Sequence, residues 1–346
     1  MTVILQHRDG VVRIDSAPAG RSRIRVDLHR RGVAMPRATC ETKYPLELVE
    51  AILTAKGPSF LCDEITRDED PGYVARHIRY DILSYVGEAF FDGGHVLDFG
   101  SGCGASTVLL ARMFPRCQFT GLELEPRFVA VARLRARYYG LANVRFAVSA
   151  DARMVPDGIG PFRAIVLSAV YEHLLPDERA AVLGALWSRL EFDGVLFANQ
   201  TPHRFLPVES HTTGLPLINY LPDGAALWVA RRFSPRVARN ESWESLLRRG
   251  IRGGTTGRIL RTLEDASRAD GGDDGERPVA AVLMEPTRNG ARDRIDLWYK
   301  MSRGARWPVA KWAVMVSSRL IRRLTGATIT PGLSIAIRKE RKTGGE

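Results

Sequence analysis

The sequence predicts an α/β fold built on a doubly wound, mostly parallel sheet. Between residues 93 and 200, short apolar runs alternate with stretches of helical spacing, and strands separated by helices pair in parallel. A glycine-rich turn, Val96–Gly104, leads from the first apolar run into a helix. A chain of 346 residues with 45% hydrophobic content can bury a sizeable core around such a sheet.

Two segments precede this core. Residues 1–43 are weakly patterned, so we expect an extended arm with one short strand at 24–28, where apolar and polar residues alternate. Residues 44–92 show helical spacing twice and predict a helical cap. An acid-rich stretch at 62–72 is expected to form the loop between the two helices.

Residues 93–200 form the predicted core. Five apolar runs are expected to be its strands: 95–99, 118–122, 144–148, 164–167 and 194–198. Ligands of such sheets bind beyond the carboxyl ends of the strands, so residues that follow these runs are candidates for the site.

The regular alternation ends near residue 200. Residues 201–330 are interpreted as a substrate-binding region, and 331–346 as an edge strand with a basic tail. Trp307–Leu324 carries an apolar stripe at helical spacing beside several arginines. This helix is interpreted as core or as a dimer face, and peripheral membrane contact through it stays open. The oligomeric state is left open.

Composition limits the possible partners, metal sites and cellular location. The formal net charge is +11, which fits either an anionic partner or a solvated basic surface. The four cysteines show no C-x-x-C spacing, so no zinc or redox motif is predicted, and they suit a reducing compartment. Neither a signal peptide nor a membrane span is expected, which favours a cytoplasmic location.

The residues around the glycine turn indicate the ligand. A G-x-G turn alone is also found in dinucleotide-binding proteins. Asp98, however, stands just before the glycines, where it would repel a pyrophosphate and attract a cationic ligand. Glu123 ends the second strand and can accept both ribose hydroxyls, and Asp151 follows the third strand and can accept the adenine amino group. Three acids at successive strand ends favour an adenosyl ligand with a positive head over NAD.

Four segments together resemble the catalytic core of class I S-adenosylmethionine-dependent methyltransferases, in their small-molecule branch: Val96–Gly104, Gly121–Glu123, Ala150–Ala152 and Ser168–Leu174. The resemblance implies a Rossmann-like fold and S-adenosyl-L-methionine as the cofactor. The cofactor-binding residues that it implies are Asp98, Gly100, Ser101, Gly102, Gly104, Glu123, Leu124, Asp151, Ala152 and Ser168. The Asn/Asp-Pro-Pro-Tyr/Phe signature of amino-methylating nucleic-acid enzymes is absent after the fourth strand, so a nucleic-acid substrate is not expected.

The stretch Asn199–Pro216 is the candidate acceptor side, because it leaves the carboxyl end of the fifth strand. It contains His211, His203 and Glu209. Histidine can remove a hydroxyl proton near neutral pH, so the two histidines are candidate bases. The same three residues could bind a metal, although nothing in their spacing requires one and none is predicted; His211 could also simply order the loop. This stretch resembles uncharacterised methyltransferases that we associate with bacterial glycan or cell-surface gene clusters.

The sequence therefore predicts a methyltransferase that acts on a hydroxyl of a sugar, a glycoconjugate or another small molecule. One alternative is a secondary-metabolite amine or hydroxyl as the acceptor. Two others are a nicotinamide-dependent oxidoreductase and a non-catalytic subunit that binds an adenosyl ligand.

Overall fold

A computed structural model describes residues 2–30, 34–151, 153–156, 158–270, 279–302 and 308–341. The chain forms two compact units. Unit 1 comprises Met1–Ile78 and Gly100–Val148, and unit 2 comprises Arg79–Phe99 and Ser149–Glu346. Each unit is described by itself.

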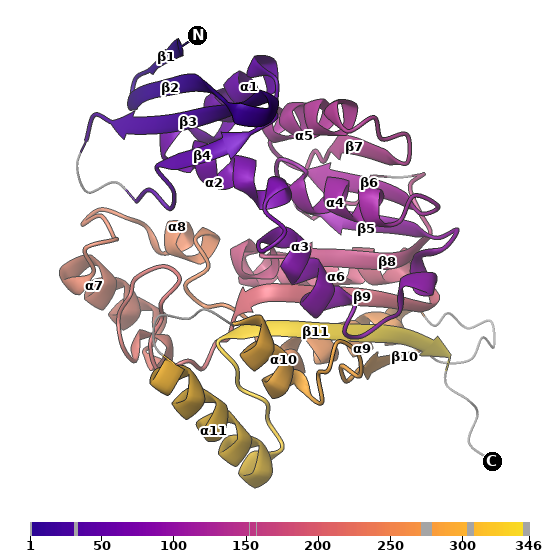
Figure 1. The fold of residues 1–346 in the computed structure, drawn as a ribbon. Helices are drawn as coiled ribbons and strands as arrows, with labels where there is room; N and C mark the ends of the chain where they lie inside the picture. The colour runs from indigo at the N-terminus through magenta and orange to yellow at the C-terminus, as the bar shows by residue number, and fades with distance from the viewer. Residues whose placement is uncertain are drawn as a thin grey trace. The chain divides into compact units, whose positions relative to one another are not determined.

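Unit 1 opens with a four-stranded antiparallel sheet, drawn in indigo in Figure 1. Its strands are β1 (Thr2–His7), β2 (Gly10–Ala17), β3 (Arg21–Leu28) and β4 (Thr39–Thr42). The prediction of an extended arm is wrong here. The apolar residues of β2 and β3 alternate and bury one face of the sheet, with Val12 and Ile24 fully covered. This burial holds in place a segment that its weak sequence pattern predicts to be an extended arm.

The helices of unit 1 begin with α1 (Leu46–Lys56), α2 (Pro58–Glu69) and α3 (Val74–His77). The expected acid-rich loop at 62–72 is mostly the second half of α2. That helix forms because Leu61, Cys62 and Ile65 are completely buried against the N-terminal sheet and α1. Its acidic residues do not mark a solvated turn.

The rest of unit 1 follows the predicted alternation. α4 (Ala105–Met113) leads to β6 (Gln118–Glu123), and α5 (Pro126–Tyr138) leads to β7 (Val144–Val148). β6 and β7 pair in parallel, as expected for strands joined by a helix.

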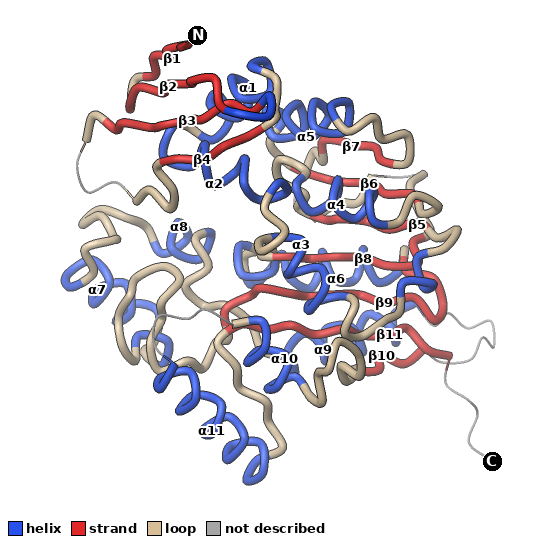
Figure 2. Tube along the Cα trace, in the orientation of Figure 1, coloured by secondary structure: helices blue, strands red, loops and turns tan. Residues whose placement is uncertain are grey.

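The sheet of unit 2 has the strand order β10-β11-β9-β8-β5. The bounds are β5 (His95–Phe99), β8 (Phe162–Ser168), β9 (Leu190–Pro202), β10 (Val279–Leu283) and β11 (Gly332–Arg341). β5, β8 and β9 pair in parallel, whereas β11 runs antiparallel to β9 and to β10. Figure 2 shows these strands in red, side by side. The predicted α/β class with a mostly parallel sheet is confirmed.

The last strand is placed differently from the prediction. We expected a strand at Leu333–Ile337 on the sheet edge, but β11 lies between β9 and β10. Ile335, Ala336 and Ile337 are all buried, which requires cover on both faces and favours an inner position. β10 supplies the edge instead.

Unit 2 also contains the helices α6 (Pro176–Ser188), α7 (Asp223–Phe233), α8 (Trp243–Arg248), α9 (Thr256–Asp270), α10 (Arg294–Met301) and α11 (Pro308–Thr325). A short 3-10 turn, η4 (Tyr171–His173), follows β8. None of the described helices is both long and apolar enough to cross a membrane.

Candidate active site

The glycine loop lies in unit 1, between Gly100 and the start of α4. The backbone N–H groups of Gly100 and Ser101 both donate to the carbonyl of Leu122, at 2.9 Å each. Gly104 has a φ of +81°, and a Cβ there would lie 2.6 Å from the Cβ of Ala132. Only glycine fits this position, for its backbone conformation and for its close packing.

The carboxylate of Glu123 meets the same loop. Its Oε2 accepts from the N–H of Gly102 at 2.8 Å, and its Oε1 accepts from the N–H of Leu124 at 2.8 Å. Leu124 leaves about half of its side chain exposed. Unit 1 therefore brings together Glu123, Leu124 and the predicted glycine-loop residues. Their roles in binding the methyl donor remain predictions.

A fully buried arginine supports this loop and was missed in the sequence. Arg135 of α5 donates to the carbonyl of Cys103 at 2.7 Å, to Oε1 of Glu64 at 2.8 Å and to the carbonyl of Glu64 at 2.6 Å. Its Nε also lies 3.4 Å from a carboxylate oxygen of Asp68. Burial alone would lower the pKa of Arg135, but the carboxylates of Asp68 and Glu64 outweigh it and raise that pKa.

No local pattern in the sequence marks this network. Its only sign is the set of acids at 62–72, a stretch that the sequence predicts as the loop between two helices. Two of these acids, Glu64 and Asp68, face inward from α2 toward Arg135.

The other predicted donor residues belong to unit 2. Asp98 is buried near the end of β5, and Ser168 ends β8. Asp151 is exposed, and its carboxylate accepts from the N–H of Arg153 at 2.8 Å. Ala152 lies outside the described residues.

Glu209 holds the loop that carries His211. It is buried, and its Oε1 accepts from the N–H groups of His211 and Thr212 at 2.9 and 2.8 Å. Its Oε2 accepts from the N–H and the hydroxyl of Thr213 at 2.6 and 2.7 Å. Because four donors occupy both oxygens, the geometry favours a positioning role for Glu209 over a role in proton transfer.

His203 is placed unfavourably for a base. Its Nδ1 accepts from the N–H of Phe205 at 3.2 Å, so this lone pair is already engaged. Burial lowers the pKa of His203 to about 4. His203 and Glu209 are also absent from the group of possible ligand residues around His211.

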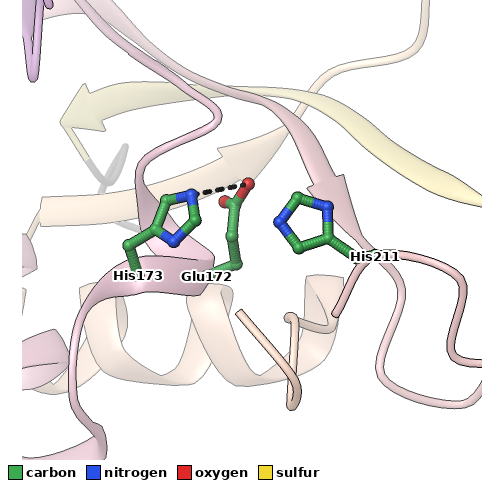
Figure 3. A group of neighbouring side chains, drawn as sticks. All are labelled: Glu172, His173 and His211. Atoms are coloured by element: carbon green, nitrogen blue, oxygen red, sulfur yellow. Dashed lines mark ion pairs between the residues drawn. The ribbon is translucent and has the colours of Figure 1, made fainter. Parts of the chain in front are cut away.

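That group consists of Glu172, His173 and His211 (Figure 3). One ligand atom of each lies within 4.8 Å of the others. Glu172 and His173 belong to η4, directly after β8, and Glu172 also accepts from the hydroxyl of Thr201 in β9 at 2.8 Å. The cluster thus stands at the carboxyl ends of two parallel strands. The stretch Ser168–Leu174 after the fourth strand is among the family-like segments of the sequence, but no sequence pattern pairs Glu172 with His211.

A groove in unit 2 offers space for a small molecule. Its volume is about 440 Å³, which is within the range of ligand sites. The lining includes an imidazole, an aromatic ring, hydroxyls and a guanidinium, from His203, Phe205, Thr255, Thr256, Thr328 and Arg294.

Residues 96–194 match the family described as "Methyltransferase domain". Carboxy-S-adenosyl-L-methionine synthase of Chromohalobacter salexigens is 36% identical over 110 residues, which are 31% of this chain and 40% of that protein. Ubiquinone biosynthesis O-methyltransferase of Xanthomonas axonopodis is 34% identical over 116 residues, 33% of this chain and 46% of that protein.

Among solved structures, an S-adenosylmethionine-dependent methyltransferase from Clostridium acetobutylicum overlaps 41% of this chain and 54% of its own, with 18% identity and a TM-score of 0.33. The chain spans less than half the length of the two curated relatives above. One of these relatives is a synthase and the other an O-methyltransferase, so the match identifies a domain and leaves the acceptor open.

Proposed function

Because residues 96–194 form a class I S-adenosylmethionine-dependent methyltransferase domain, we propose that the whole chain transfers a methyl group from S-adenosyl-L-methionine to a hydroxyl oxygen of a small molecule. The resemblance and the cofactor predicted from the sequence are confirmed for this domain. A nicotinamide-dependent oxidoreductase is thereby set aside. A sugar or glycoconjugate hydroxyl is the acceptor class that we propose first.

The proposal that the acceptor is an oxygen rests on the cluster of Glu172, His173 and His211 at the carboxyl ends of β8 and β9. A hydroxyl is a poor nucleophile until its proton is removed, whereas a neutral amine needs no such help. A pair of imidazoles beside a carboxylate suits that task.

The proposed reaction is an in-line displacement. The acceptor oxygen donates an electron pair to the methyl carbon, the carbon–sulfur bond breaks, and its electron pair stays on sulfur. The products are a methyl ether and S-adenosylhomocysteine. The hydroxyl proton leaves through His211, whose side chain is exposed to an incoming acceptor. The enzyme otherwise contributes by positioning the two reactants.

A labelled-methyl assay on fractionated cell extract tests this function. We expect transfer by the intact protein, and a loss of about 10²–10⁴-fold in His211→Ala with binding of S-adenosylhomocysteine unchanged. His29→Ala is the matched control, since His29 is an exposed histidine of unit 1. Unchanged methyl transfer in His211→Ala would show that His211 is not the base. If the intact protein binds the donor but transfers no methyl group to any fraction, the proposed function is contradicted.

A further inference from the structure

We propose that Glu172, His173 and His211 bind a divalent transition-metal cation of the zinc type. The binding itself is a property of the resting protein. Its use in catalysis rests on the proposed function above. Two histidines and one carboxylate are a common donor set of catalytic zinc sites, in which a fourth position stays open.

The first argument is the tautomer of His173. Its Nδ1 lies 2.7 Å from the carbonyl oxygen of Arg248, and a carbonyl can only accept, so Nδ1 carries a proton. In the neutral ring, Nε2 then presents its lone pair. Histidines that bind metals characteristically donate their other ring N–H to a backbone carbonyl in this way.

The second argument is an unsatisfied carboxylate oxygen. Glu172 is completely buried, and its Oε2 accepts from Thr201. Its Oε1 forms no hydrogen bond with any described residue, yet it faces Nε2 of His173 across 3.8 Å, the dashed line in Figure 3. When Nε2 carries no proton, two lone pairs face each other at this distance, and a positive charge between them, a proton on Nε2 or a bound cation, satisfies both. Leaving such an oxygen unpaired in the interior is costly.

The third argument is the space around the cluster. Gly250 has a φ of +91°, and a Cβ there would lie 2.9 Å from Cδ2 of His211 and 3.1 Å from Cγ of Glu172. The chain therefore leaves out a side chain where His211 and Glu172 approach each other. His211 is exposed and stands on the other side of Glu172 from His173 (Figure 3).

The distances require a local rearrangement. At tetrahedral angles, zinc–nitrogen bonds of about 2.0–2.1 Å place two ligand atoms of one ion about 3.4 Å apart. The atoms here lie within 4.8 Å of one another, so closure by up to about 1.4 Å is needed, and the exposed ring of His211 can supply it.

A cation at this position would act on the acceptor oxygen. Coordination lowers the pKa of a bound hydroxyl, so the proton leaves to water while the oxygen stays available to attack the methyl carbon. His211 would then serve as a ligand of the cation. The displacement itself, with its bond from oxygen to carbon and its electron pair left on sulfur, is unchanged.

Zinc titration of metal-free full-length protein by calorimetry tests the site. We expect one zinc per chain, with affinity at least about tenfold weaker in His211→Asn and in Glu172→Gln. His29→Asn is the control for adventitious binding by exposed histidines. His211→Asn removes an exposed side chain, so its folding is not at stake. Equal zinc affinity in the intact protein and both variants would overturn the proposal.

A second pair of variants tests the geometry. Gly250→Ala should weaken zinc binding because the new methyl group would displace His211. Gly257→Ala, where a Cβ meets no atom within 4 Å, should leave it unchanged. Zinc binding without methyl transfer would retain the site and contradict the proposed function, whereas transfer by protein that binds no zinc would retain the function and overturn the site.

A separate observation concerns α11. Five large apolar side chains of this helix are exposed by 41–78%: Val309, Trp312, Val316, Leu320 and Leu324. They form one stripe on its outer face, because their spacing of three, four, four and four residues follows the helical repeat. The geometry points to an anionic lipid surface as the partner of this stripe.

Charge favours a membrane over a second copy of this chain. The helix contains no acidic residue. Arg319 and Arg323 border the stripe, are exposed, and form no ion pair with any described residue. Two copies that met through this face would bring these arginines together, whereas an anionic bilayer would attract them and accept the indole of Trp312 at its interface.

Vesicle flotation tests this surface with the full chain. We expect binding to vesicles of phosphatidylcholine with phosphatidylglycerol, and about thirtyfold weaker binding after Arg319→Ser with Arg323→Ser. Trp312→Ser with Leu320→Ser should also release the protein, while Leu46→Ser, an exposed leucine of unit 1, should not. Equal binding to pure phosphatidylcholine, or concentration-dependent dimerisation abolished by the same variants, would overturn the proposal.

Discussion

Two loops of this molecule are each held by one buried charged residue, but in opposite ways. Arg135 holds the glycine loop of unit 1 through the carbonyl of Cys103, 32 residues away in the sequence. Glu209 holds the His211 loop of unit 2 through N–H groups only two to four residues away. The glycine loop therefore has a motif that is local in the sequence, but the residue that holds it is distant in the sequence. The His211 loop is held by a residue nearby in the sequence, whereas its chemical partners, Glu172 and His173, are distant in the sequence.

The largest expected effect comes from removing the distant support. Arg135→Met leaves the carboxylates of Glu64 and Asp68 buried without their cation, and we expect a loss of about 3–5 kcal/mol in the free energy of unfolding. Urea denaturation measures it. Arg137→Met changes an exposed arginine of the same helix and should stay near the parent. Similar stability of the two variants would show that the network does not support unit 1.

Gly104→Ala tests the glycine loop itself. The new Cβ would meet Ala132 and Phe146 while its residue is forced to positive φ, so we expect about 2–4 kcal/mol of destabilisation and weaker binding of S-adenosylhomocysteine. Calorimetric titration and thermal unfolding report the two effects. Gly140→Ala shares the positive φ but has open space around it, so donor binding should persist there.

His203 makes the stability of unit 2 depend on pH. Its pKa is about 4 in the folded chain, against about 6.5 for an unfolded histidine. The unfolded state therefore takes up the proton first, and up to about 3 kcal/mol of stability is present above pH 6.5 and lost as the pH falls to 4. Urea denaturation at several pH values should show a shallower dependence for His203→Gln. The same slope in both proteins would contradict this assignment.

The smallest effect is expected for Glu209→Gln. The amide can replace one acceptor oxygen but turns a donor toward N–H groups, which should cost about 1–3 kcal/mol. If Glu209 only positions His211, methyl transfer should fall with an unchanged pH profile, and the activity lost in Glu209→Ala should be partly restored in Glu209→Gln. A shifted pH profile would instead place Glu209 in proton transfer.

The sequence alone determined the parallel α/β core, the glycine loop and the domain class. These features are local, because a buried strand, a turn at positive φ and a helix lie within about 20 consecutive residues, and each acid stands where its own strand ends. The hydrophobic period therefore sufficed to place them.

Only the tertiary structure decided the four-stranded sheet of unit 1, the inner position of β11, the inward-facing acids of α2, and the cluster of Glu172, His173 and His211. Each depends on residues that are far apart in the chain. A charged residue has the same sequence signature whether it meets water or a buried partner, so the pattern alone could not tell a solvated loop from an ion pair, or a solitary histidine from a ligand.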